Sequence, residues 1–138
     1  MSITASQVQG DVYQFLKGSD LAKSLSGEVY RRGYRPRDSR LEDAEVIFTT
    51  GLPGEIEKGV ITINIYCPDI DPYNDGVYVE NGQRISEIEK AADNWVKTLV
   101  AGRSNYLFSL KEAIHSTADA ETRQHFVVIK LNYRYYEL

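Results

Sequence analysis

Residues 60–67 read VITINIYC, and the alternation of side chains in this stretch is the clearest indication of a β-sheet in the chain. Successive side chains of an extended chain point to opposite sides, so its aliphatic residues share one face and its more polar residues the other. The aliphatic face consists of Ile61, Ile63, Ile65 and Cys67. We therefore predict a strand with one buried face.

The segment before this strand predicts its partner. Residues 44–50 read AEVIFTT, which is rich in strand-forming residues. The intervening residues 51–54, Gly-Leu-Pro-Gly, are typical of a turn, since proline restricts φ and glycine accepts positive φ. Two strands joined by so short a turn should pair antiparallel.

The segment after the strand predicts the helix that covers it. Across residues 83–100, apolar side chains recur at intervals of three and four, with charges on the opposite face. They are Ile85, Ile88, Ala92, Trp95 and Leu99, and Ala101-Gly102 ends the pattern. A sheet face and a helix stripe must bury each other, so Ile61, Ile63, Ile65, Trp95 and Leu99 are the predicted core.

The N-terminal part predicts a helix over residues 4–18, with Val8, Val12, Phe15 and Leu16 at helical spacing and Gly18 as its end. A short helical turn over residues 19–27 follows, which Ser19 can cap. From Glu28 the sequence predicts a strand, and residues 33–43 have the composition of a loop.

The C-terminal part leaves two interpretations open. Residues 104–116 fit a helix capped by Ser104, or a strand that forms a hairpin with residues 125–138 across a polar loop, and we favour the hairpin. The predicted order is then α-β-β-β-α-β-β. It describes one α+β domain over residues 1–138, with a mixed or antiparallel sheet flanked by two main helices.

Composition limits the function classes. The 138 residues suit one domain, and 42% hydrophobic with 26% charged residues is ordinary for a globular protein. A net charge of −4 argues against a dedicated nucleic-acid binder, which normally carries a basic surplus. No apolar run is long enough for a membrane span, and the start lacks the pattern of a signal peptide, so we expect a cytoplasmic protein. A single cysteine, Cys67, leaves no internal disulfide and no multi-cysteine metal site.

No motif predicts catalysis, a cofactor or a metal. The stretch DIDPYNDG matches a calcium loop at Asp71, Asp75 and Gly76, but Tyr73 and Gly82 occupy positions where such a loop needs oxygen ligands. His115 and His125 flank the predicted last loop, where they could lie close together, but a third zinc ligand is not evident. The adjacent acids Glu42 and Asp43 should diverge and make a poor acid–base pair. Cys67 ends the most apolar strand and should behave as a small buried hydrophobe.

The unusual charge feature is a group of five arginines within ten residues, with two tyrosines nearby. The arginines are Arg31, Arg32, Arg35, Arg37 and Arg40, and the tyrosines are Tyr30 and Tyr34. One interpretation is a contact with an acidic partner or phosphates, because arginine binds carboxylates and phosphates through a planar fork. The other is a solvated loop whose arginines pair locally with Glu42, Asp43 and Glu45. Both stay open.

Three segments together resemble the tail-completion (tail-terminator, head–tail joining) proteins of phages and prophages. They are GEVYRRGYRPRDSRLEDAEVIFTTG (27–51), GVITINIYCPDI (59–70) and HFVVIKLNYRYYE (125–137), and the similarity spans about residues 8–136. The resemblance implies an α+β fold and a virion structural protein without catalytic residues. It also implies a homo-oligomeric ring, often of six subunits, that caps the tail tube and meets the head connector.

The resemblance supplies candidate interface residues in two loops. In a head-to-tail ring, basic and acidic patches of neighbouring copies would meet. The basic set is Arg31, Arg32, Tyr34, Arg35, Arg37 and Arg40, and the acidic set is Asp69, Asp71, Tyr73 and Asp75. The alternative function is a binding module that uses the arginine loop to contact an acidic protein or nucleic acid. An enzyme with an unrecognised site ranks last.

Overall fold

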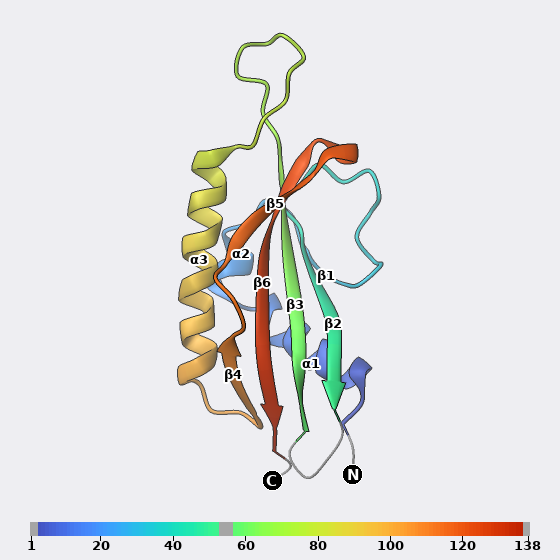
Figure 1. Cartoon of the computed structure of the whole chain (residues 1–138), viewed down its shortest axis with the longest axis vertical. Coiled ribbons are helices and arrows are strands. Elements are labelled where there is room, and N and C mark those ends of the chain that lie inside the picture. The colour runs from blue at the N-terminus through green and yellow to red at the C-terminus, as the bar shows by residue number, and fades with distance from the viewer. Residues whose placement is uncertain (1–2, 53–56, 137–138) are drawn as a thin grey trace.

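Strand β3 (Glu57–Pro68) lies in the middle of a six-stranded mixed sheet with the order β1-β2-β3-β6-β4, in which β5 also pairs with β6. The computed structural model describes residues 3–52 and 57–136. Figure 1 shows the long strands side by side with helices behind and beside them. The predicted α+β class is confirmed.

The elements follow the chain in a simple order. Helix α1 (Ala5–Lys17) and the short α2 (Asp20–Lys23) precede β1 (Val29–Arg31), β2 (Ala44–Leu52) and β3. Helix α3 (Gly82–Ala101) leads into β4 (Tyr106–Leu110), β5 (His115–Asp119), the 3-10 turn η1 (Ala120–Thr122) and β6 (Gln124–Tyr135). The predicted cap at Ser19 is confirmed, since its side chain accepts from the Ala22 N–H. Thr4, which the prediction placed within the first helix, caps α1 by accepting from the Gln7 N–H.

The predicted antiparallel pairing of β2 with β3 is confirmed, and β1 joins β2 in parallel, which makes the sheet mixed. The predicted turn begins too early, because Gly51 and Leu52 still pair with Gly59 and Lys58. Pro53 and Gly54 lie outside the described residues. Gly51 and Gly59 are directly opposite each other, and the ring of Tyr133 lies so close that a Cβ at either glycine would meet it. The pairing of β2 with β3 beyond Thr50 therefore depends on glycine at positions 51 and 59, where the side chain of Tyr133 leaves no room for a larger residue.

The C-terminal hairpin is more extensive than expected. Residues 106–110 form a strand, as the favoured interpretation predicts, but residues 115–119 form a further strand where a loop is expected. Since β3 occupies one edge of β6 along its whole length, β4 and β5 share the other edge, with Leu110 opposite Leu131 and His115 opposite Val128. The sequence of β5 is polar and does not indicate a strand, because β5 is held in the sheet by its backbone pairing with β6. The actual turn is confined to η1 and Arg123, whose φ of 54° is left-handed.

The core lies between one face of the sheet and the helices. Ile61, Ile63 and Ile65 are fully buried, and Trp95 of α3 is 5% exposed, as predicted. Leu99 is only partly buried at the edge of this core. Helix α1 contributes Val8, Val12 and Leu16 to this core, and all three are fully buried. In the described part of the chain, α1, α2 and α3 all cover this face, and no α-helix lies on the opposite face of the sheet, here called the helix-free face (Figure 1). Within the residues described, no helix is both long and apolar enough to span a membrane.

Candidate interaction surfaces

A loop of residues 69–81, here called the arm, projects from the body between β3 and α3 (Figure 1). It is a narrow structure with paired sides. Ile70 and Val79 exchange both backbone hydrogen bonds at 2.9 Å, which forms an isolated antiparallel bridge near its base.

The tip of the arm is organised by its own acidic side chains. The Asp71 carboxylate accepts hydrogen bonds from the backbone N–H groups of Asp75 at 3.0 Å and Gly76 at 2.9 Å. These bonds, led by that from Gly76, lower the pKa of the Asp71 carboxyl because they favour its charged form. Asn74 and Gly76 have φ values of 54° and 82°, which tightens the turn. The calcium-loop pattern in this stretch is therefore the pattern of a backbone turn, with Asp71 occupied by N–H groups.

A single histidine of β6 contacts both sides of the arm's base. The Nδ1 atom of His125 lies 2.7 Å from Oδ1 of Asp69, where the arm begins. Its Nε2 atom lies 3.7 Å from Oε2 of Glu80, where the arm ends, and Ser116 of β5 donates to the same Glu80 oxygen at 2.7 Å. Asp69, one of the predicted interface acids, is thus bound within the chain, with its side chain 9% exposed. Its role at an interface stays a prediction.

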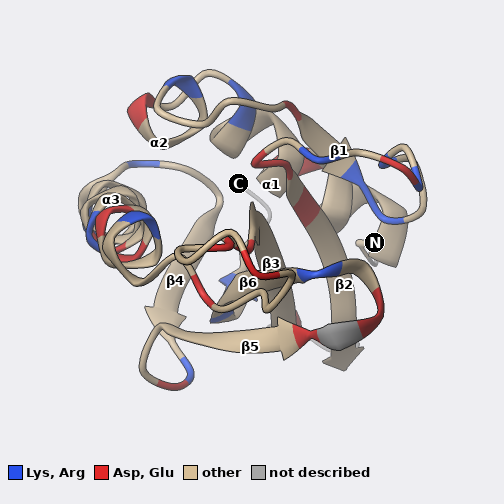
Figure 2. Cartoon of the chain, turned by 90° about the horizontal axis from the view of Figure 1, so that it is seen from above, with Lys and Arg blue, Asp and Glu red and all other residues tan. Residues whose placement is uncertain are grey.

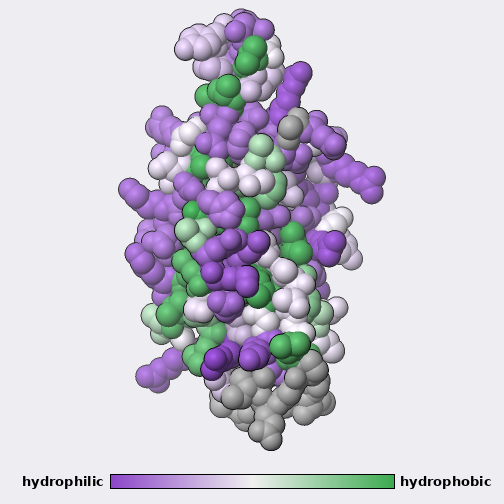
Figure 3. Space-filling view, viewed as in Figure 1, coloured by the Kyte–Doolittle hydropathy of each residue, from purple (hydrophilic) through white to green (hydrophobic). Residues whose placement is uncertain are grey.

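The arm exposes apolar side chains on both sides of its tip. Five of its residues are at least a third exposed: Ile70, Tyr73, Val77, Tyr78 and Val79. Tyr73 is 84% exposed and Val77 60%. The ring of Tyr78 packs against the guanidinium of Arg123, which lies 4.4 Å from the ring centre. Figure 3 shows green, hydrophobic side chains at the projecting end of the molecule, among paler and hydrophilic ones. Clustered exposed apolar residues are typical of an interaction surface.

The arginine loop, residues 31–40, divides into anchored and exposed residues. Arg35 is anchored: its side chain is 10% exposed and its Nε donates to Oδ2 of the buried Asp43 at 2.9 Å. The same guanidinium stacks 3.9 Å from the ring centre of Tyr66 and donates to Gln124 at 3.1 Å. This local pairing matches one of the two interpretations of the arginine cluster, and it makes Arg35 a part of the fold.

Arg40 and Arg31 also contact their own chain. Arg40 donates to the backbone carbonyls of Thr122 and Arg123, which ties the loop to the last hairpin, and the Arg31 guanidinium lies 5.5 Å from the ring centre of Tyr13. Glu45 receives the N–H of Gly33 instead of an arginine.

Arg32, Tyr34 and Arg37 are exposed, with Tyr34 at 76%. Figure 2 shows the basic residues of this loop beside β1, on the side of the molecule away from α3. Arg31 and Arg40 are exposed as well but contact their own chain, so Arg32, Tyr34 and Arg37 are the members of the predicted basic set that are best suited to test a partner contact.

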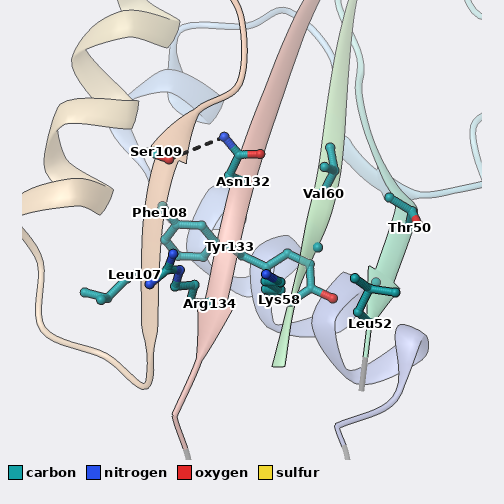
Figure 4. A pocket seen from close by; sticks show the side chains of 12 residues that line it. Thr50, Leu52, Lys58, Val60, Leu107, Phe108, Ser109, Asn132, Tyr133 and Arg134 are labelled. Atoms are coloured by element: carbon teal, nitrogen blue, oxygen red, sulfur yellow. Dashed lines mark hydrogen bonds between the residues drawn. The ribbon is translucent and has the colours of Figure 1, made fainter. Parts of the chain in front are cut away.

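The helix-free face of the sheet contains a hollow of about 650 Å³ near the end of the molecule opposite the arm. Figure 4 shows residues from β2, β3, β6 and β4 around it. The apolar residues that line the hollow include Leu52 and Leu107, whose exposed fractions are 62% and 58%, and Val60, which is buried. Asn132 donates to Ser109 at 3.5 Å across one side.

Two cations belong to the same hollow. Lys58 and Arg134 are directly opposite each other on β3 and β6, and both are exposed. Like charges directly opposite on a sheet repel. The residues that line the hollow within the described ranges 3–52 and 57–136 include no aspartate or glutamate. The hollow therefore combines apolar surface with two exposed cations. Sequence reasoning did not find it because the residues come from four separate strands.

The residues considered for chemistry lie apart. His115 pairs with Val128, three positions from His125 on β6, so the two imidazoles face opposite sides of the sheet. Cys67 is 2% exposed, and burial raises the pKa of its thiol to about 11. Glu42 and Asp43 diverge as predicted, toward Arg84 and Arg35. In the described part of the chain, no three His, Cys, Asp or Glu side chains are grouped for a metal ion.

Comparison with known proteins adds little. No protein-family model matches the chain, and no curated protein matches it. One similar solved structure shares 17% identity over 96% of both chains, with a TM-score of 0.43, and its printed title states no function.

Proposed function

We propose that this protein is a non-enzymatic structural protein that works by self-association, and that the arm is part of its contact with other copies. The observation that carries the proposal is the ordered projection of exposed apolar residues at 70–79. Such surface costs free energy in water, and removing it into an interface recovers roughly 25 cal/mol per Å². The turn formed by Asp71 and the His125 contacts hold the arm in one shape, so that little entropy is lost on docking.

The finer proposal places the protein in a phage-like particle, as a ring that caps the tail tube or joins tail to head. Its support is the sequence resemblance, and the arm is compatible with it. Tail-tube and head-connector proteins would then be the further partners. Incubation with purified tail tubes, followed by sedimentation, tests this step: the protein should co-sediment with tube ends.

Self-association is tested by sedimentation velocity from about 10 μM to 1 mM. The range extends to high concentration because we expect a contact made by one short loop to be weaker than a standard interface of roughly 800 Å² per partner. The arm variant Tyr73→Ser/Val77→Ser should shift the parent's oligomer to monomer. The matched control is Val100→Ser, which removes an apolar side chain 54% exposed on α3. A parent that remains monomeric at every concentration, and on tail tubes, contradicts the proposal.

The alternative, a binding module for an acidic partner, is favoured by one observation: Arg32 and Arg37 are exposed on a loop that Arg35 and Arg40 anchor. Such a complex should weaken steeply with salt, and Arg32→Glu/Arg37→Glu should abolish it without altering self-association.

A further inference from the structure

We infer that the receptor for the arm is the hollow on the helix-free sheet face of a second copy, so that the protein associates head-to-tail. This inference rests on the proposed self-association and adds the identity of the opposing surface.

Charge complementarity is the first support. Residues 69–81 include four carboxylates, Asp69, Asp71, Asp75 and Glu80, and no lysine or arginine. Asp75 is exposed at the tip, and Asp71 is half-buried beside it, where the N–H groups of Asp75 and Gly76 lower the pKa of its carboxyl. The hollow presents Lys58 and Arg134, whose mutual repulsion an acidic tip would relieve.

Apolar complementarity is the second support. Tyr73 and Val77 extend from the arm, while Leu52 and Leu107 flank the hollow and are exposed by more than half. An occupant that is both acidic and apolar suits this lining better than a small inorganic anion would, because an anion leaves the leucines in water.

Geometry requires that the occupant come from another molecule. The arm begins after Pro68 at one end of β3, and the hollow includes Lys58 at the other end. Ten residues of strand span about 33 Å, at roughly 3.3 Å each. Figure 1 shows the arm extending away from the strand ends that form the hollow, so it cannot fold back onto its own hollow. Two different patches of one surface then meet, and such contacts close into rings when the rotation allows it.

Reversal of the hollow's charge tests the inference. The hollow variant Lys58→Glu/Arg134→Glu should weaken self-association by about tenfold or more. The control Lys23→Glu/Lys90→Glu makes the same change of net charge at exposed positions on α2 and α3 and should leave association near that of the parent. Circular dichroism of both variants checks that the fold is retained.

Mixing the two damaged proteins gives the decisive measurement. The arm variant (Tyr73→Ser/Val77→Ser) retains its hollow, and the hollow variant retains its arm. Each should be monomeric alone, whereas an equimolar mixture should form a 1:1 dimer that grows no further, because only one intact pair of surfaces is present. Suppose that the parent associates and the arm variant does not. If the hollow variant then associates normally, or if the mixture stays monomeric, the receptor for the arm lies elsewhere. This inference then fails, while the proposed function stands. A parent that never associates overturns both.

Discussion

The guanidinium of Arg35 donates to the carboxylate of Asp43 at 2.9 Å, in a pair whose side chains are 10% and 1% exposed. Asp43 also accepts the Glu28 N–H at 3.0 Å and a hydrogen bond from Ser39, so this one carboxylate joins β1, the arginine loop and the start of β2. Arg35, which the sequence suggests to be a surface residue, is thus the ion-pair partner of the buried Asp43.

The first prediction follows from this pair. Arg35→Ala should destabilise the protein by about 3–5 kcal/mol, because removal of one partner leaves a buried charge uncompensated. Arg35→Lys should not restore stability, since lysine lacks the fork that reaches Asp43 and Gln124 together and stacks on Tyr66. Urea denaturation followed by circular dichroism measures both.

The matched control is Arg37→Ala in the same loop, whose side chain is exposed and should change stability by less than about 0.5 kcal/mol. If Arg35→Ala and Arg37→Ala unfold at the same urea concentration, the pair does not stabilise the fold. The contrast also shows that only exposed arginines, such as Arg32 and Arg37, are suitable for testing an interface.

The second prediction concerns acid stability. Arg84 of α3 holds Glu42 through two hydrogen bonds of 2.7 Å, which lower the pKa of the Glu42 carboxyl below its usual 4.5. A carboxyl whose pKa is lower in the folded state stabilises that state above the unfolded pKa. This stabilisation, about 1–2 kcal/mol for a partly exposed pair, should disappear as the pH falls from about 4.5 through the lower folded pKa.

The measurement is the difference in unfolding free energy between the parent and Glu42→Gln at pH 6 and at pH 3. The difference should be largest at pH 6 and shrink at pH 3. Glu87→Gln serves as the control, because Glu87 binds the same arginine at 3.3 Å but is 55% exposed. A difference that is constant over this range would mean that the ion pair contributes nothing dependent on ionisation.

Regular periodicity accounts for what the sequence could predict. The two-residue alternation of VITINIYC and the three-four spacing of α3 report burial directly, because one covered face demands apolar side chains. Strand β5 could not be found in this way, since its HSTAD residues are mostly exposed and its backbone pairing with β6 leaves no hydrophobic signature.

The interaction surfaces were harder to predict for a different reason. The arm and its acidic residues are contiguous in sequence, so a long polar loop could be recognised. The contacts of His125 with Asp69 and of Arg84 with Glu42 span 56 and 42 positions. No local sequence pattern predicts such pairs. The hollow could not be predicted locally either, because its lining residues come from four separate strands.

The third prediction tests the helix placement. Trp95→Ala should cost about 3–5 kcal/mol, because it opens a cavity between α3 and the sheet. Val100→Ala on the same helix, at a side chain 54% exposed, should cost less than about 0.5 kcal/mol. Since Trp95 is the sole tryptophan, unfolding must be followed by circular dichroism. Equal stability of both variants would place α3 elsewhere.

The last prediction concerns the base of the arm. The Nδ1 atom of His125 lies 2.7 Å from Oδ1 of Asp69, whose side chain is 9% exposed, and an imidazole with its proton on Nδ1 donates to that oxygen. His125→Phe removes this donor and leaves Asp69 with an unsatisfied, largely buried oxygen. The arm should then open more often, and the amides of Ile70 and Val79, which bond each other across the arm, should exchange with deuterium about tenfold faster. In His125→Gln, which retains an N–H donor, the exchange rates of these amides should fall between those of the parent and those of His125→Phe.

The amide of Ile63 in the core of β3 provides the internal control and should exchange at the parent's rate if the change is local. If Ile70 and Val79 keep their protection in His125→Phe, the bridge and the Asp71 turn alone hold the arm. If Ile63 loses protection equally, His125 stabilises the whole domain and not the arm in particular.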